Sequence, residues 1–169
     1  PHVPFGDPRK PETVIGPLAT QAQYDKVVSA VDDARAAGAR VLTGGETADI
    51  NGGWFYRPTV LADVDNSADC VQEEIFGPVL TVQPFDTEQE AIELANSTDY
   101  GLAAGIQTEN ISRAHRVADA LAAGIVWVNS WAMLDPSMPF GGVKSSGWGR
   151  ENGPEQLHEY TRTKSVIIA

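Results

Sequence analysis

The order of strand-like and helix-like segments in the middle of the chain is the feature that most restricts its fold. Apolar strand patterns occur at Val79–Phe85, Leu102–Gln107 and Ile125–Val128. Helical patterns separate them, one ending near Asn96 and the other covering Ile111–Ala123. Strands that alternate with helices of about ten residues are typical of right-handed crossover units in a parallel sheet. We therefore predict an α/β fold with a parallel sheet and flanking helices.

Two capping patterns mark where helices begin. Thr20 is followed three residues later by Gln23, and Thr87 is followed in the same way by Glu90. A hydroxyl residue with Glu or Gln three positions on is typical of a capping box, in which the two residues satisfy each other's backbone N–H groups. Gly38 then predicts the end of the first helix, since glycine readily adopts the left-handed conformation found after a helix.

Shorter elements lie on either side of the alternating region. Before it, Arg40–Thr43 is predicted as a strand and Trp54–Leu61 as a β-rich run. After it come the Gly- and Pro-containing loop Ser130–Gly149, a short helix at Pro154–His158 and a final strand at Tyr160–Ile168. A strand at the end of a chain leaves its backbone groups unpaired unless it finds a sheet edge. We predict that Tyr160–Ile168 pairs with another subunit and makes the protein a homo-oligomer.

Charge and composition exclude several classes of partner. The 169 residues include 12 Lys and Arg against 23 Asp and Glu, a net charge of −11. Binding to a phosphate backbone needs clustered cations, so a nucleic-acid partner is not expected. No run of about 18 apolar residues predicts a membrane span, and the first residues lack a signal-peptide pattern. With a single cysteine, the chain cannot form an internal disulfide, which fits the reducing cytoplasm.

The single cysteine and the three histidines do not indicate a catalytic or metal site. Cys70 has Asp69 and Glu73 among its neighbours in sequence. A reactive thiolate needs an electropositive environment, so Cys70 is interpreted as structural. The histidines are far apart and lack the spacing of metal ligands, so no metal site is predicted; they are His2, His115 and His158.

Two further motifs have a functional and a structural interpretation. Glu73 and Glu74 are adjacent, and adjacent side chains do not share a face, so the two cannot act as acid and base on one bond. One of them can nevertheless point toward a ligand. Gly147–Gly153 is rich in glycine, but its spacing and the absence of a preceding strand do not match the dinucleotide-binding fingerprint. Its glycines are predicted to permit tight turns, and Phe140 is predicted to lie in a constrained loop.

Several linked motifs resemble the aldehyde dehydrogenase superfamily, in the order found in that family. They are Glu73–Val79, Asn96–Leu102, Gly124–Asn129, Pro139–Lys144 and Ser146–Glu151. The resemblance extends to the beginning of the chain, at Gly6–Pro8 and Gly16–Pro17. Because it covers the whole chain with correct spacing, it is far more specific than a single glycine pattern.

The resemblance implies oxidation of an aldehyde to a carboxylic acid with NAD or NADP, through a thiohemiacetal on a cysteine. The family's nucleophilic cysteine and general-base glutamate precede Pro1 in the family's order, so the chain as given is expected to contain no catalytic residue. By resemblance, Glu74 binds the nicotinamide ribose and Phe76 packs beside the nicotinamide. Leu134 and Phe140 line the aldehyde channel, and Leu134 stands where many members carry an aromatic residue.

We therefore predict a fragment of an NAD(P)-dependent aldehyde dehydrogenase. Residues 1–150 form the C-terminal portion of the catalytic domain, and residues 151–169 form a short helix and an oligomerisation strand. The chain alone is expected to be inactive. Two alternatives stay open, namely a non-catalytic binding or structural protein that reuses the fold, and an acyl-CoA-forming relative.

Overall fold

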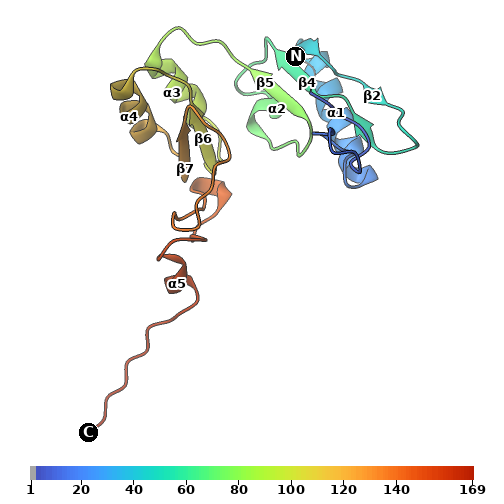
Figure 1. The fold of residues 1–169 in the computed structure, drawn as a ribbon. Helices are drawn as coiled ribbons and strands as arrows, with labels where there is room; N and C mark the ends of the chain where they lie inside the picture. The colour runs from blue at the N-terminus through green and yellow to red at the C-terminus, as the bar shows by residue number, and fades with distance from the viewer. Residues whose placement is uncertain (1–2) are drawn as a thin grey trace. The chain divides into compact units, whose positions relative to one another are not determined.

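The computed structural model describes residues 3–169, which divide into two compact units, one up to Pro84 and the other Phe85–Ala169. Figure 1 follows the chain through its helices and strands. The fold is mixed α/β with small sheets. The predicted division at residue 150 is not tested by this separation and stays a prediction. In the described part of the chain, no helix is long and apolar enough to cross a membrane.

The first unit combines one long helix with a three-stranded sheet of order β1-β4-β5. β1 is antiparallel to β4, and β4 is parallel to β5. The strands β2 and β3 form a separate antiparallel hairpin. The bounds are α1 Gln21–Ala36, β1 Arg40–Thr43, β2 Thr47–Ala48, β3 Phe55–Tyr56, β4 Thr59–Ala62, α2 Asp69–Gln72 and β5 Val79–Val82.

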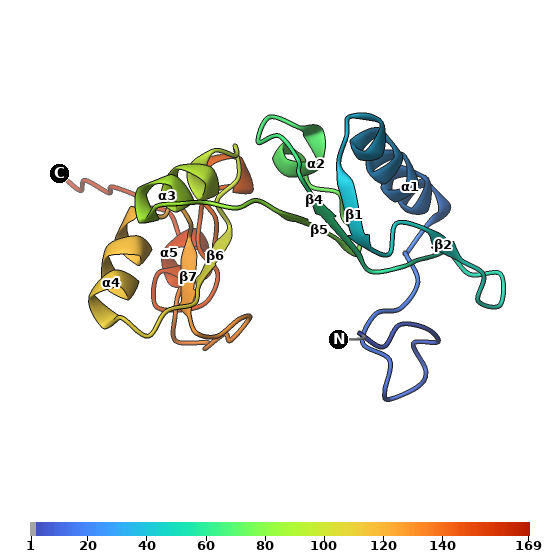
Figure 2. The same cartoon turned by 90° about the horizontal axis from the view of Figure 1, so that it is seen from above.

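Helix α1 covers one face of this sheet and forms the core of the unit. Val27 and Val31 of α1 and Leu61 of β4 are completely buried, and Ala34 and Tyr56 complete the buried cluster. Burial of each of the large side chains contributes roughly 1.5–3 kcal/mol. Figure 2 shows α1 lying along β1 and β4. The helix is therefore fixed to the sheet along its length and can orient side chains on its other faces.

The predicted boundaries of α1 are confirmed. The Thr20 hydroxyl accepts a hydrogen bond from the Gln23 backbone N–H at 3.2 Å, as in a capping box. Gly38 follows the helix with a φ of +102°, a conformation that favours glycine. The Gln23 side chain, however, does not return to the cap, because its amide binds elsewhere, as described below.

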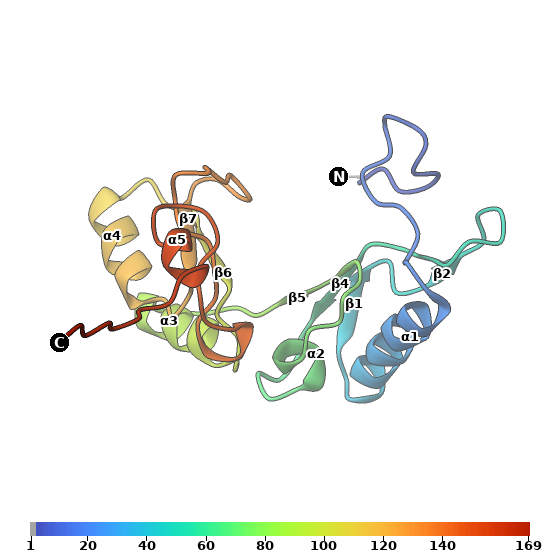
Figure 3. The ribbon, with the colours of Figure 1, turned by 90° about the horizontal axis from the view of Figure 1, so that it is seen from below.

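The second unit is built on a parallel strand–helix–strand arrangement. β6 and β7 are parallel neighbours and α4 connects them, which is the crossover that the sequence predicts. Figure 3 shows α4 beside this pair of strands. The bounds are α3 Glu88–Asn96, β6 Ala103–Ile106, α4 Ile111–Ala120, β7 Ile125–Val128, the 3₁₀ turn η1 Lys144–Ser146 and α5 Gln156–Glu159.

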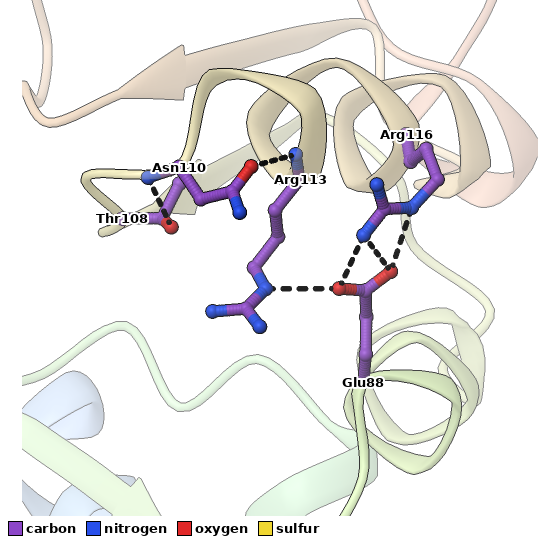
Figure 4. Close-up of polar contacts among 5 residues, drawn as sticks. All are labelled: Glu88, Thr108, Asn110, Arg113 and Arg116. Carbon is purple, nitrogen blue, oxygen red and sulfur yellow. Dashed lines mark hydrogen bonds and ion pairs between the residues drawn. The ribbon is translucent and has the colours of Figure 1, made fainter.

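A charged cluster joins α3 to α4. Glu88, in the first turn of α3, accepts hydrogen bonds from the guanidinium groups of Arg113 and Arg116 at 3.0–3.1 Å (Figure 4). The Asn110 side chain accepts from the Arg113 backbone N–H at 3.0 Å and caps α4. Arg116 and Arg113 hold the pKa of Glu88 below its ordinary value, chiefly through these hydrogen bonds.

The structure differs from the sequence predictions at several points. The described strands form three small sheets instead of one parallel sheet, and β1 runs antiparallel. The run Trp54–Leu61 is divided into β3 and β4, with Pro58 between them, because proline cannot donate a ladder hydrogen bond. Helix α4 ends at Ala120, before the predicted Ala123, and α2 was not predicted.

The predicted terminal strand is not formed within the chain. Residues 161–169 have no strand pairing in the structure, and Val166, Ile167 and Ile168 are exposed. An intersubunit strand needs a second chain, so the assembly through Tyr160–Ile168 stays a prediction.

Candidate functional site

The segment between α2 and β5 carries two of the predicted site residues in unusual positions. Glu74 and Phe76 are both exposed, and the Phe76 ring is 67% accessible to solvent. Phe76 has a φ of +57°, in the left-handed region that is uncommon for a bulky residue. An exposed aromatic ring on a sterically disfavoured backbone requires contacts that hold the backbone in place.

Side chains from α1 provide these contacts. The Gln23 amide nitrogen donates to the carbonyl oxygens of Ile75 and Phe76 at 2.7 and 2.8 Å. The Lys26 Nζ atom donates to the Glu74 carbonyl oxygen at 2.9 Å, and it lies 6.0 Å from the centre of the Phe76 ring. Three successive carbonyl groups are therefore held by two side chains one helical turn apart.

Close packing fixes the end of the same segment. Gly77 lies against Val27, and a Cβ atom at position 77 would overlap the Val27 side chain. Beyond it, the Pro78 carbonyl oxygen accepts a hydrogen bond from the Thr59 backbone N–H at 2.8 Å, which joins the segment to the sheet. The segment Glu74–Gly77 is thus anchored to α1 along its length while the Glu74 and Phe76 side chains are exposed.

A groove of about 470 Å³ runs beside this segment, lined by residues of α1, α2 and the segment itself. Glu73, Glu74 and Lys26 line it together with Cys70. Cys70 is half-buried with a free thiol, and burial, reinforced by the charge of Asp69, raises its pKa. The direction of this shift agrees with the prediction for the Cys70 thiol, but its main cause is burial, and Asp69 is the acidic neighbour that adds to it.

The second unit places Phe140 in an ordered loop, as predicted. Its backbone N–H donates to the Glu151 carbonyl oxygen at 2.7 Å and its carbonyl accepts from the Glu151 N–H at 2.8 Å. Arg150 donates to the carbonyl oxygens of Gly142 and Gly149 at 2.9 and 2.7 Å. These bonds fold Gly147–Gly153 back onto the part of the loop that contains Phe140.

The glycines of this loop permit that fold. Gly147, Gly149 and Gly153 all have positive φ values, so the interpretation of these residues as turn glycines is confirmed. Phe140 lines a pocket of about 290 Å³ with residues from both arms of the folded loop, such as Trp148, and with Gln156 of α5. Leu102, directly before β6, and Tyr160, directly after α5, also line it.

Leu134 lies earlier in the same loop and is exposed. The residue before it is fixed by the Trp127 indole N–H, which donates to the Met133 carbonyl oxygen at 2.8 Å. The Trp127 and Trp131 rings are in contact, with centres 4.9 Å apart. Leu134 is not among the described residues that line the Phe140 pocket.

The structure thus brings Glu74 close to Phe76 in the first unit and places Leu134 and Phe140 on one loop of the second. Sequence reasoning missed Gln23 and Lys26, which hold the Glu74–Phe76 backbone. Their partners lie about fifty positions away, so no local pattern identifies them. The capping pattern assigned the Gln23 side chain to the helix end, and that assignment was wrong.

Among residues 3–169, no group of three or more His, Cys, Asp or Glu side chains is arranged to hold a metal ion. His115 lies in α4 and His158 in α5, whereas His2 lies outside the described residues.

The known proteins that are similar to this chain point to one family. The sequence profile described as the aldehyde dehydrogenase family matches residues 2–166. A betaine aldehyde dehydrogenase from Cereibacter sphaeroides is 49% identical over 164 residues, which cover 97% of this chain and 34% of that protein. The chain therefore spans about a third of the length of the curated relatives that it matches.

Solved structures give the same result. Betaine aldehyde dehydrogenase from Staphylococcus aureus in complex with NAD⁺ superimposes with a TM-score of 0.90 at 43% identity, over 94% of this chain and 32% of that one. A mutant aldehyde dehydrogenase from Bacillus cereus superimposes with a TM-score of 0.92 at 46% identity, over 97% of this chain and 33% of that one.

Proposed function

This chain belongs to the aldehyde dehydrogenase family, and we propose that it is part of an enzyme that oxidises an aldehyde to a carboxylic acid with NAD or NADP. In this proposal the Glu74–Gly77 segment contacts the coenzyme, and the Leu134–Phe140 loop lines the path of the aldehyde. The observation that carries the proposal is the anchored segment, which presents a carboxylate and an aromatic ring to solvent on a fixed backbone.

The residues of this segment fit a nicotinamide nucleotide. A carboxylate has two acceptor oxygens, so Glu74 can accept from the two hydroxyl groups of a ribose. The exposed Phe76 ring offers a flat apolar surface for the nicotinamide. The coenzyme, when bound, supplies a hydride acceptor. The contribution of this chain is to place the nicotinamide, which matters because small misplacements in a reacting pair are costly to rate.

NAD is the preferred coenzyme in this proposal, because several of the similar Staphylococcus aureus structures are complexes with NAD⁺. Betaine aldehyde is the first substrate to test, because the similar curated proteins are betaine aldehyde dehydrogenases. Leu134 and Phe140 are proposed as the residues of this chain that face the aldehyde.

The covalent chemistry is assigned to residues outside this chain. A nucleophile needs a lowered pKa or an adjacent base, whereas burial raises the pKa of the Cys70 thiol. We therefore propose that the nucleophilic cysteine and the general-base glutamate are supplied by the remainder of the enzyme. In the whole enzyme, the parallel pairs β4–β5 and β6–β7 would belong to the family's catalytic-domain sheet, and Tyr160–Ile168 would pair with a neighbouring subunit.

An activity assay tests this function. The chain of 169 residues and a longer protein containing it are each incubated with NAD⁺ or NADP⁺, betaine aldehyde and a panel of other aldehydes. We expect the longer protein to form reduced coenzyme and a carboxylic acid, and the chain alone to be inactive. Turnover by the chain alone that is lost in Cys70→Ala would contradict the assignment, and so would a longer protein that oxidises no aldehyde. Formation of a thioester only when coenzyme A is added would replace the hydrolytic function with an acyl-transferring one.

A further inference from the structure

We propose that Gln23 is a positioning residue, which holds Phe76 in its left-handed conformation and thereby sets the direction of the Phe76 ring. The inference rests on the proposed contact between Phe76 and the nicotinamide. It assigns a role to a residue of α1 that acts through the backbone of another segment.

The first step is that Gln23 uses both of its amide protons on adjacent carbonyl groups. The amide nitrogen lies 2.7 Å from the Ile75 carbonyl oxygen and 2.8 Å from that of Phe76. The two carbonyls belong to the two peptide groups that flank the Phe76 Cα atom, so holding both on one donor group restrains the φ and ψ of Phe76. Glutamine suits this position because its amide nitrogen carries two N–H donors, whereas a carboxylate would face the carbonyls with acceptors only.

The second step is that the conformation of Phe76 is one it would not adopt without support. A φ of +57° is disfavoured for a residue with a Cβ atom and a bulky side chain. Such conformations persist where the surroundings fix them, and they gather at ligand-binding sites. Lys26 restrains Glu74, the residue before Ile75 and Phe76, because its Nζ atom donates to the Glu74 carbonyl oxygen at 2.9 Å.

The third step is that the face of α1 from which these side chains extend is rigid. Gln23, Lys26 and Val27 lie at i, i+3 and i+4 on α1, which places them on neighbouring positions of one face. Val27 is completely buried and contacts Gly77, directly after Phe76. Because the Phe76 ring itself is largely exposed, its direction depends on the backbone that Gln23 holds.

The test compares three variants. Gln23→Met keeps the shape of the side chain without the donors, and Gln21→Met is the matched control, since Gln21 is exposed on the same helix. Phe76→Ala reports whether the ring itself contributes to coenzyme binding. In the chain of 169 residues, NMR measures the intraresidue HN–Hα NOE of Phe76, which is strong at positive φ. In the enzyme that contains the chain, steady-state kinetics separate KM for NAD⁺ from kcat and from KM for the aldehyde.

We expect Gln23→Met to lose the strong NOE of Phe76 and to raise KM for NAD⁺ about thirtyfold, the effect of losing two ordinary hydrogen bonds. KM for the aldehyde and the behaviour of Gln21→Met should stay at wild-type values. If Gln23→Met does not fold, Gln23→Asn replaces it, because its amide is one methylene too short to reach both carbonyls.

Two results separate the inference from the function on which it rests. A wild-type NOE and wild-type KM for NAD⁺ in the folded Gln23 variant, with a raised KM in Phe76→Ala, would overturn the positioning role alone. A wild-type KM for NAD⁺ in Phe76→Ala would instead overturn the proposed coenzyme contact. Loss of the NOE in Gln23→Met then still shows that Gln23 sets the backbone conformation.

Discussion

Gly124, directly before β7, lies so close to Gly141 that a Cβ atom at position 124 would overlap the Gly141 carbonyl oxygen. The Gly124 backbone N–H also donates to the Gly101 carbonyl oxygen at 3.0 Å, so the backbone cannot move aside without breaking this bond. The loop that contains Phe140 therefore packs directly against the main chain at the beginning of β7.

This contact predicts that Gly124→Ala destabilises the second unit by about 1–3 kcal/mol, the usual cost of overpacking. Gly105→Ala is the control, and it should be less destabilising than Gly124→Ala. A Cβ atom at position 105 would meet only the edge of the exposed Trp131 ring, at 3.1 Å. Thermal or denaturant unfolding measures both variants. A Gly124→Ala variant that is as stable as wild type would show that the loop does not pack on Gly124 as described.

The Glu88 cluster predicts a pH-dependent contribution to stability. Arg116 and Arg113 lower the pKa of Glu88 in the folded state, so its contribution is present above the pKa of the unfolded chain and is lost as the pH falls through the folded value. Glu88→Gln should lower the melting temperature near neutral pH, and the difference from wild type should disappear in acid. Glu109→Gln, at an exposed position before α4, is the control. A difference in melting temperature that persists unchanged in acid would show that the charge of Glu88 does not cause it.

Leu134→Phe tests the proposed aldehyde path. If Leu134 faces the substrate, a larger ring there should shift kcat/KM between small and bulky aldehydes by about 1–3 kcal/mol, which is typical of one pocket contact. KM for NAD⁺ should not change. Equal effects on all aldehydes in the panel would remove Leu134 from the path.

The exposed end of the chain predicts an assembly role. Val166, Ile167 and Ile168 are 69–93% exposed, and residues 161–169 form no strand within the chain. If this segment pairs with a neighbouring subunit as proposed, removal of all residues after Glu159 from the enzyme should yield smaller species or an insoluble protein, because a sheet edge then loses its partner strand. Light scattering measures the mass, and a truncated enzyme with its parent's mass and stability would contradict the role.

The sequence predicts the elements whose signals are local. The boundaries of β1 and β7 are those expected, and both helix starts at Thr20 and Thr87 are capped as the patterns indicate. The parallel β6–β7 pair also follows, because a helix of suitable length connects the two strands. In each case the information lies within a few residues of the element.

Features that depend on distant partners could not be predicted. The antiparallel direction of β1 is set by its pairing with β4, some twenty residues on. The support of Phe76 by Gln23 joins residues 53 positions apart, and nothing around Gln23 distinguishes it from a capping residue. Glu74 and Phe76 themselves were identified only by resemblance, because an adjacent pair of glutamates and an exposed phenylalanine carry no local signature of a coenzyme.

The coenzyme contact at Glu74 is the central claim, and single-turnover kinetics of Glu74→Gln in the whole enzyme test it most directly. The substitution keeps the size of the side chain but removes the charge that a pair of ribose hydroxyls would meet. The account predicts that hydride transfer to NAD⁺ slows by about a hundredfold while aldehyde affinity changes little. An unchanged single-turnover rate together with wild-type affinity for NAD⁺ would contradict it.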